Sequence, residues 1–220
     1  TDTWAQDTYA ATNALQQGAQ WESQRTSANG VLSFDGADDY VMLDDTVIRS
    51  KDLQISLAAL WKGGTAKQNL FWFGDETAYM AFTPCNENGV AELTITDGQT
   101  TEHLTASAPL VKGEWSKITI RIIDGKGTLL INGSQAASNR LSLTPLAVMS
   151  AARDDYAFLG KGMTDRNFKG AVDYMNFYFK EVEEPQLTYS GSEAVDNTDP
   201  GVSGIRGGRK RRRTVQYCGS

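Results

Sequence analysis

The sequence predicts an all-β fold of antiparallel strands, arranged as a sandwich or a barrel. From residue 31 onward, short runs of β-branched and aromatic residues recur about every 8 to 12 residues, separated by Gly, Asp and Asn, a spacing typical of sandwiches and barrels. In Trp115–Ile123, isoleucines alternate with polar residues, which predicts that one face of this strand is buried and the other is exposed to solvent. No repeat of about 20 to 50 residues is visible, which argues against a propeller or a solenoid.

The first predicted strands form a hairpin, at residues 31–34 and 39–43. Two apolar runs, Val31–Phe34 and Tyr40–Leu43, flank a turn rich in aspartate and glycine. Runs this short, bounded by such residues, favour strands over a helix, which needs more residues and a 3.6-residue period. The turn carries three carboxylates, at Asp35, Asp38 and Asp39.

Further strands follow along the chain in the same style. We expect them at residues 53–62, 69–74, 78–83, 90–96, 101–107, 115–123, 127–132, 155–160 and 170–180. The run Asp-Gly-Lys-Gly at residues 124–127 predicts a tight hairpin between two of them. Asn132-Gly133 marks a second turn directly after that hairpin.

The chain divides into one folded domain with two flanking segments. Its 220 residues suffice for a single β domain with its own core. Residues 1–29 are interpreted as a linker or a packed N-terminal segment, in which 8–17 has a weak helical pattern. Residues 30–182 form the predicted sandwich. Residues 183–220 are polar with Pro and Gly and end in a basic stretch, so we expect a disordered linker and a basic tail.

The charge distribution argues against nucleic acid as a partner of the sandwich. Six basic residues follow Pro200 with no acid among them, which leaves 15 basic and 27 acidic residues, a formal charge of −12, in residues 1–200. Such a domain repels a phosphate backbone. The basic stretch 206–213 leaves three interpretations open: a disordered tail, the start of a bacterial C-terminal sorting segment with T-V-Q-Y, or a nuclear-localisation or nucleic-acid signal.

Cysteine usage and hydropathy add little about the compartment. The two cysteines, Cys85 and Cys218, do not support a disulfide framework. No apolar run reaches the about 18 residues of a membrane span. The chain opens with polar T-D-T-W instead of a signal peptide, so we expect a mature fragment or an excised module.

An ordered set of segments across residues 30–182 resembles the laminin G-like, concanavalin A-like jelly roll, in the accessory form found in secreted bacterial glycan-degrading enzymes. These segments are L-S-F-D-G-A-D-D-Y-V at 32–41, D-L-Q-I-S-L-A-A-L-W at 52–61, Y-M-A-F-T-P at 79–84, G-E-W-S-K-I-T-I at 113–120, G-T-L-L-I-N-G at 127–133, F-L-G-K at 158–161 and F-K-G-A-V-D-Y-M at 168–175. The resemblance implies two packed antiparallel sheets and no catalytic residues. It also implies that Trp61 and Trp115 lie in the core.

The resemblance implies a non-catalytic module that binds a glycan or braces a neighbouring catalytic domain, secreted or on the bacterial cell surface, and monomeric. Two alternatives stay open: a self-sufficient jelly-roll glycoside hydrolase or lyase, and a protein-adhesion module. Catalysis has little support in the residues. The single His103 has no serine elbow nearby, and the E-x-D-x-x-E pattern of jelly-roll hydrolases occurs in no predicted strand.

A structural calcium ion is the one cofactor that the sequence suggests. Asp173 shares its parity with Met175 and Phe177 on the apolar face of the last strand, and an isolated buried carboxylate is costly. If the first and last strands are neighbours, Asp173 joins Asp35, Asp38 and Asp39 to offer the oxygen ligands that Ca2+ prefers. Asp35 and Asp173 are the first candidates among these ligands. The alternative is that Asp35 and Asp39 accept hydrogen bonds from backbone amides of their own turn and that Asp173 caps a strand end.

Seven residues are candidates for ligand contact. The resemblance implies that Phe73 points inward, and by strand alternation Trp72 then faces outward and offers an indole on which a sugar ring stacks. It equally suits packing beneath a loop or a neighbouring domain. Tyr79 and Tyr156 are candidates on the same grounds. The loop 161–169 adds the polar residues Lys161, Asp165, Arg166 and Asn167, since loops at one rim of such sandwiches bind ligands in related proteins; the alternative is a solvated loop.

Overall fold

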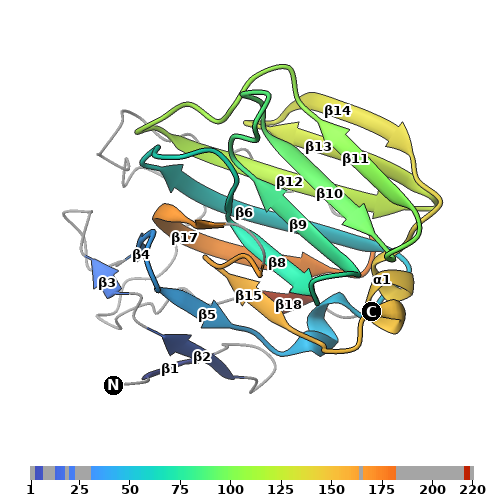
Figure 1. Ribbon diagram of the computed structural model, residues 1–220, viewed down its shortest axis with the longest axis horizontal. Helices are drawn as coiled ribbons and strands as arrows, with labels where there is room; N and C mark the ends of the chain where they lie inside the picture. The colour runs from blue at the N-terminus through green and yellow to red at the C-terminus, as the bar shows by residue number, and fades with distance from the viewer. Residues whose placement is uncertain are drawn as a thin grey trace, which may run out of the picture.

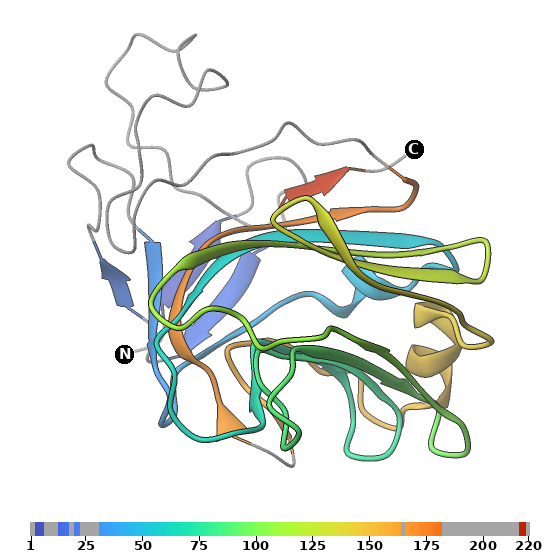
Figure 2. The ribbon, with the colours of Figure 1, turned by 90° about the horizontal axis from the view of Figure 1, so that it is seen from above.

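The structure, a computed structural model, is a sandwich of two large antiparallel sheets, as the sequence predicts (Figures 1 and 2). It describes residues 31–163 and 166–181 in full, and the backbone of four short strands at 3–6, 13–17, 20–22 and 216–218. In Figure 1 one sheet lies in front of the other, and Figure 2 shows the two layers edge-on. We call them the front sheet and the back sheet.

The front sheet has eight strands. Their order across the sheet is β1 (Thr3–Gln6), β2 (Asn13–Gln17), β5 (Tyr40–Met42), β15 (Ala157–Leu159), β8 (Phe71–Gly74), β9 (Tyr79–Thr83), β10 (Glu92–Thr96) and β11 (Thr101–Thr105). All neighbours in this order pair antiparallel. The strands β1 and β2 stand where the sequence predicted a linker or a packed segment with weak helical character.

The back sheet is built around two long strands, β6 (Leu53–Trp61) and β12 (Trp115–Ile123). Its order is β14 (Ser134–Arg140), β13 (Lys126–Ile131), β12, β6, β17 (Lys169–Tyr178), β4 (Val31–Asp35) and β3 (Gln20–Glu22), and β18 (Gln216–Cys218) pairs parallel with β17. A separate pair of short parallel strands joins β7 (Gln68–Asn69) to β16 (Arg166–Asn167).

The strands β4 and β17 are antiparallel neighbours, with Asp35 opposite Lys169. This confirms that the first and last strands expected for the sandwich lie side by side. The register of β17 against β6 shifts between Val172 and Tyr174, so Asp173 occupies a bulge. Because a bulge changes which residues share a face, strand parity does not place Asp173 with Met175.

The main hydrophobic core fills the space between the sheets. Ile118, Ile120 and Ile122 point into it from β12, together with Trp61 and the stacked rings of Phe71 and Phe73. Because such a core is densely packed, substitutions that remove side-chain volume from it are expected to lower the stability of the fold. Trp115 is buried as expected, but in a second cluster with Leu60 and Tyr174 on the other face of the back sheet. The alternation of β12 explains this, since Trp115 and Ile118 have opposite parity.

Two short helices close the sandwich at one end (Figure 1). The 3-10 helix η1 (Asp45–Ile48) follows β5, and the α-helix α1 (Pro145–Ala151) follows β14. Thr144 caps α1 by accepting a hydrogen bond from the Ala147 amide, and Val148 and Met149 enter the core. In the part of the chain that the structure describes, no helix is long and apolar enough to cross a membrane.

Candidate functional site

The outer face of the front sheet carries three rows of side chains that run across the strands. Alternate residues of a strand share a face, so the strand register defines each row. The central row is Met42, Phe158, Trp72, Ala81, Thr94 and His103. A second row, on one side of the central row, is Gly74, Tyr79, Thr96 and Thr101, and Tyr156 lies next to Gly74. The third row, on the other side, is Thr83, Glu92 and Thr105. Aromatic residues gather on β5, β15 and β8, and polar residues on β10 and β11.

Phe158 forms the floor of an aromatic cluster in these rows. It is 4% exposed; Tyr156 stacks on it at 5.2 Å between ring centroids, and Tyr40 meets it edge-on at 5.3 Å. The Lys161 ammonium lies 4.4 Å from the Tyr40 ring centroid and 4.8 Å from that of Phe158, which is cation–π geometry. Tyr40, Tyr156 and Lys161 remain partly exposed. We call these four residues the aromatic cluster.

Trp72 lies on the expected face but is not exposed. Its side chain is 1% exposed, because the ring of its neighbour Tyr79 stacks over it with 4.0 Å between centroids. The indole Nε1 donates to the Asp75 carbonyl at 3.1 Å. The expectation of an open tryptophan platform is therefore wrong: strand alternation gives the face on which a residue lies, not what covers it there. Tyr79 is the half-buried ring at this position.

Asp75 fixes the turn beside the cluster. Its carboxylate accepts hydrogen bonds from the amides of Thr77, Ala78 and Arg153 and from the Thr77 hydroxyl. Desolvation alone would raise the pKa of this buried carboxyl, but the hydrogen bonds outweigh it and lower the pKa to about 2. Arg153 lies in the segment that leads through Tyr156 into β15. The hydrogen bond from its amide to Asp75 therefore links the β8–β9 turn to the segment that carries Tyr156. Nothing in the residue pattern marked Asp75 as a candidate.

The polar end of the rows holds a small hydrogen-bonded network that sequence reasoning missed. His103 Nδ1 lies 3.2 Å from Thr94 Oγ1 and 3.6 Å from a Glu92 carboxylate oxygen. The Thr105 hydroxyl donates to the other Glu92 oxygen at 2.8 Å. His103 and Thr105 are exposed, and Thr94 and Glu92 are partly exposed. In the sequence, polar residues occupy alternate positions at 92, 94 and 96 and at 101, 103 and 105. This alternation was the available signal that these side chains share one face.

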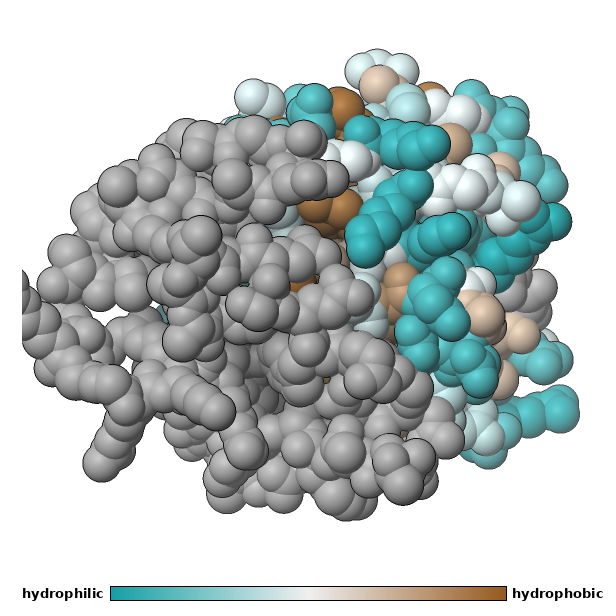
Figure 3. All heavy atoms as spheres, turned by 90° about the vertical axis from the view of Figure 1, so that its left-hand side faces the viewer, coloured by the Kyte–Doolittle hydropathy of each residue, from teal (hydrophilic) through white to brown (hydrophobic). Residues whose placement is uncertain are grey.

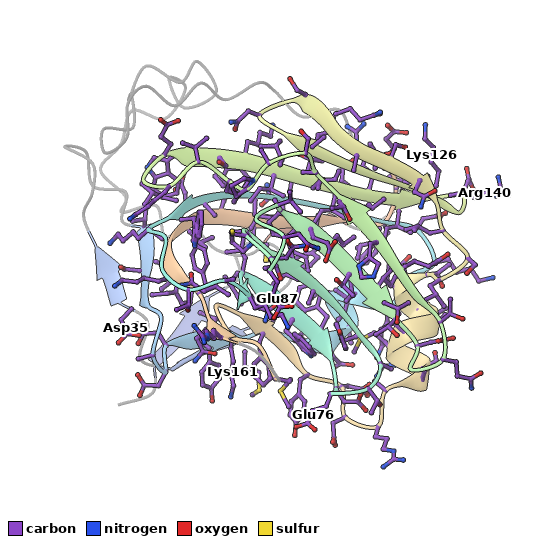
Figure 4. The ribbon with its side chains drawn as sticks, turned by 45° about the horizontal axis from the view of Figure 1, so that its top comes forward. Asp35, Glu76, Glu87, Lys126, Arg140 and Lys161 are labelled. Carbon is purple, nitrogen blue, oxygen red and sulfur yellow. The ribbon has the colours of Figure 1, made fainter. Side chains whose placement is uncertain are left out.

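The loop 161–169 sends its predicted ligand residues in different directions. Lys161 turns onto the aromatic cluster. Asn167 donates from Nδ2 to the Ala37 carbonyl at 2.7 Å and so braces the turn of the first hairpin. Arg166, in β16, donates its amide to the Lys67 carbonyl and leaves its side chain exposed. Asp165 lies outside the described residues. Figure 4 shows Lys161 and Asp35 at the same end of the molecule, opposite Lys126 and Arg140.

Three of the four predicted calcium ligands come together. One carboxylate oxygen from each of Asp35, Asp38 and Asp39 lies within 4.8 Å of the others. Asp39 accepts the Asp35 amide at 2.8 Å, and Asp35 accepts the Ala37 amide at 2.6 Å. Burial, together with the neighbouring carboxylates, raises the pKa of Asp39 despite the opposing backbone hydrogen bond. These hard oxygen donors and their mutual repulsion suit a calcium ion.

Asp173 lies apart from this group. Asp35 is opposite Lys169, and Asp173 follows four residues later, about 13 Å along an extended strand. It is 2% exposed and sits in the β17 bulge. The proposed meeting of Asp35 and Asp173 over one ion does not fit this geometry, although their strands are neighbours.

Comparison with known proteins places the fold. The chain belongs to the concanavalin A-like lectin/glucanases superfamily, whose laminin G-type family model matches residues 35–188. No curated protein sequence matches the chain significantly.

Solved structures share the architecture at low identity. Domain 4 of AbnA, a GH43 extracellular arabinanase from Geobacillus stearothermophilus, solved with arabinotriose, is 18% identical with a TM-score of 0.61, over 72% of this chain and 74% of that domain. The CBM40 of an IT-sialidase from Ruminococcus gnavus, bound to α2,3-sialyllactose, is 15% identical with a TM-score of 0.58, over 70% and 91%. A variant of the NanB sialidase from Streptococcus pneumoniae is 15% identical with a TM-score of 0.52, over 87% of this chain and 28% of the sialidase.

Proposed function

We propose that this chain is a non-catalytic carbohydrate-binding module that holds a glycan on the outer face of its front sheet. The observation that carries the proposal is the aromatic cluster, in which Tyr40 and Tyr156 are held partly exposed around the buried ring of Phe158. Phenol rings present an apolar face for sugar C–H groups and a hydroxyl for hydrogen bonds. The Lys161 ammonium adds a donor beside them.

The rows of the front sheet favour binding over hydrolysis. Retaining hydrolysis uses two carboxyl groups about 5 to 5.5 Å apart, and inverting hydrolysis uses two about 6.5 to 9.5 Å apart. In the three rows, within the part of the chain that the structure describes, Glu92 is the one carboxylate. This supports a binding role over the alternative of a self-sufficient hydrolase or lyase.

The surface gives the adhesion alternative little support. In the residues that the structure describes, Met42 and Val111 are the exposed large hydrophobic residues, and they come from separate elements. On the one side of the molecule that Figure 3 shows, the described surface is mostly hydrophilic with small apolar spots. Protein interfaces of stable complexes are usually marked by larger contiguous apolar areas. A sugar, which is polar with small apolar faces, matches this surface better.

The relatives suggest where such a module works. One structural relative is a domain of an extracellular arabinanase, and another belongs to a sialidase. By analogy, the chain acts on the outside of a bacterial cell, secreted or at the surface, beside a catalytic domain for which it holds substrate. A purely bracing role toward that domain is the second candidate, and it predicts no affinity for free glycans.

Titration calorimetry with arabinotriose, sialyllactose and a panel of other oligosaccharides tests the proposal. We expect saturable binding to at least one of them, and Tyr156→Ala to weaken it at least tenfold. Tyr178→Ala, which removes a partly buried tyrosine from the back sheet, is the matched control and should bind normally. A reducing-sugar assay accompanies the titration; release of sugar by the purified chain would contradict the non-catalytic assignment, and a chain that binds none of the glycans would leave the bracing role.

A further inference from the structure

We infer that the ligand is a neutral oligosaccharide that lies across the strands of the front sheet, from the aromatic cluster to a second subsite at His103, Glu92 and Thr94. This inference rests on the proposed function and names its substrate class.

The strand order sets the length of the proposed binding face. Tyr156 adjoins β15, and His103 lies on β11, with β8, β9 and β10 between them. Neighbouring strands lie about 4.8 Å apart, so the two ends of the face are about 19 Å apart. A single sugar ring bound at the aromatic cluster cannot reach His103, whereas a chain of several rings can.

Between Tyr79 and His103, the side chains on the proposed binding face are short. Ala81 follows Trp72 in the central row, and Thr94 follows Ala81. Thr83 is their neighbour in the row that leads to Glu92. Ala81 is 3% exposed, so the partly exposed Thr83 and Thr94 are the groups that a chain would meet between the Tyr79 ring and His103. Thr83 and Thr94 offer hydroxyls along this stretch, each a donor and an acceptor.

The far subsite has the polar groups that sugar hydroxyls need. Glu92 provides carboxylate oxygens, while Thr94, His103 and Thr105 provide groups that both donate and accept. Two hydrogen bonds, between Thr94 and His103 at 3.2 Å and between Thr105 and Glu92 at 2.8 Å, orient these side chains before a ligand arrives. Positioned polar groups beside an aromatic platform are the usual composition of a sugar-binding face, because apolar contact supplies affinity and polar contact supplies orientation.

The charges around the face favour neutral sugars. Glu92 lies within the far subsite, and the Asp35, Asp38 and Asp39 carboxylates lie in the turn directly before Tyr40. Glu76, in the β8–β9 turn, is also exposed, and Figure 4 shows Lys161 between it and Asp35. Two cations lie at this end: Lys161, whose ammonium lies over two rings of the aromatic cluster, and the exposed Arg153, three residues before Tyr156. An anionic sugar would meet more like charge than opposite charge along this path, and like charge lowers affinity.

The test measures affinity against ligand length and ligand charge. The probes are neutral arabino-, xylo- and gluco-oligosaccharides, each as monomer, trimer and hexamer, and sialyllactose and trigalacturonate as acidic ligands. We expect affinity for one neutral series to rise with length and to exceed that for both acidic ligands. His103→Ala and Thr94→Ala should each lower hexamer affinity about tenfold, the loss of a hydrogen bond to a sugar, and leave monomer affinity unchanged. Gln135→Ala, an exposed polar change on β14, is the control.

The possible failures are distinguishable. A wild-type chain that binds oligosaccharides with the same affinity at every length, or variants at His103 and Thr94 that bind the hexamer normally, would overturn the second subsite while the proposed function stands. Tighter binding of sialyllactose or trigalacturonate would overturn the neutral class. Absence of binding to every probe would overturn the proposed function and this inference together. Circular dichroism and thermal melting of each variant show that the fold is intact before affinities are compared.

Discussion

The ring of Tyr79 lies over the indole of Trp72, with 4.0 Å between their centroids and 24° between their planes. The pair crosses from β9 to β8 on the outer face of the front sheet. The tryptophan contributes buried area and the tyrosine contributes the accessible ring. Under the proposed function, Trp72 therefore serves stability and Tyr79 serves contact with the glycan.

Trp72→Ala should destabilise the fold by about 3 to 5 kcal/mol, the usual cost of removing a fully buried Trp. Denaturant unfolding measures this free energy. Val111→Ala, at a site 55% exposed, is the control and should change stability by less than about 0.5 kcal/mol. A cost for Trp72→Ala near that of the control would contradict the burial of the indole beneath Tyr79.

Acid should weaken the fold through Asp75. Its folded-state pKa of about 2 lies below the usual 3.8, so the charged form stabilises the native state. This contribution is fully present above about pH 4 and is lost as the pH falls toward 2. At pH 7, Asp75→Asn should cost about 2 kcal/mol, and the gap to the wild type should close between pH 4 and 2. Asp154→Asn, an exposed carboxylate nearby, is the comparison, and a gap that does not change with pH would count against this account.

Calcium should raise the melting midpoint if the Asp35, Asp38 and Asp39 turn holds the ion. A ligand that binds only the folded state at 100 times its Kd adds about 2.7 kcal/mol of stability. Melting with calcium and with chelator measures the effect, and Asp38→Asn should abolish it while Asp124→Asn should not. Equal midpoints in both conditions, with no metal found by elemental analysis, would remove calcium from the description.

Gly160→Ala should destabilise the chain more than Gly89→Ala. Both glycines have positive φ, +86° and +75°, so both substitutions carry backbone strain of about 1 to 2 kcal/mol. A Cβ on Gly160 would also lie 2.3 Å from the buried ring of Phe34, whereas Gly89 faces open space. Equal losses in thermal melts of the two variants would show that Phe34 moves aside at little cost.

Much of the fold could be predicted because its strands carry clear patterns. The alternating isoleucines of β12 identified both the strand and its core face. β14 was missed because its sequence, S-Q-A-A-S-N-R, is almost wholly polar; its place in the sheet comes from pairing with β13, which no local pattern reveals. The helix α1 was missed because it spans only seven residues, too few for a 3.6-residue period to show.

The candidate site was predictable only in part. Tyr79, Tyr156 and Lys161 were named from the sequence, and the structure places all three on the outer face of the front sheet, but Tyr40 and Phe158 were not named with them. Their association depends on the pairing of β5 with β15, strands separated by more than a hundred residues in the chain. Asp173 is buried as expected, but the register sets it apart from Asp35, and the bulge at its position shifts the parity on which its assignment depended.

The hydrogen bonds around Asp75 bear on the entropy of ligand binding. Its carboxylate holds the Arg153 amide, and the Gly74 amide donates to the Tyr156 carbonyl at 2.7 Å, so the backbone beside Tyr156 is anchored from two directions. A ring that is already ordered loses little conformational entropy when a sugar binds to it. The smaller entropy cost raises the affinity. Under the proposed function, Asp75 is therefore a preorganising residue, and glycan affinity should fall together with stability when its carboxylate is protonated.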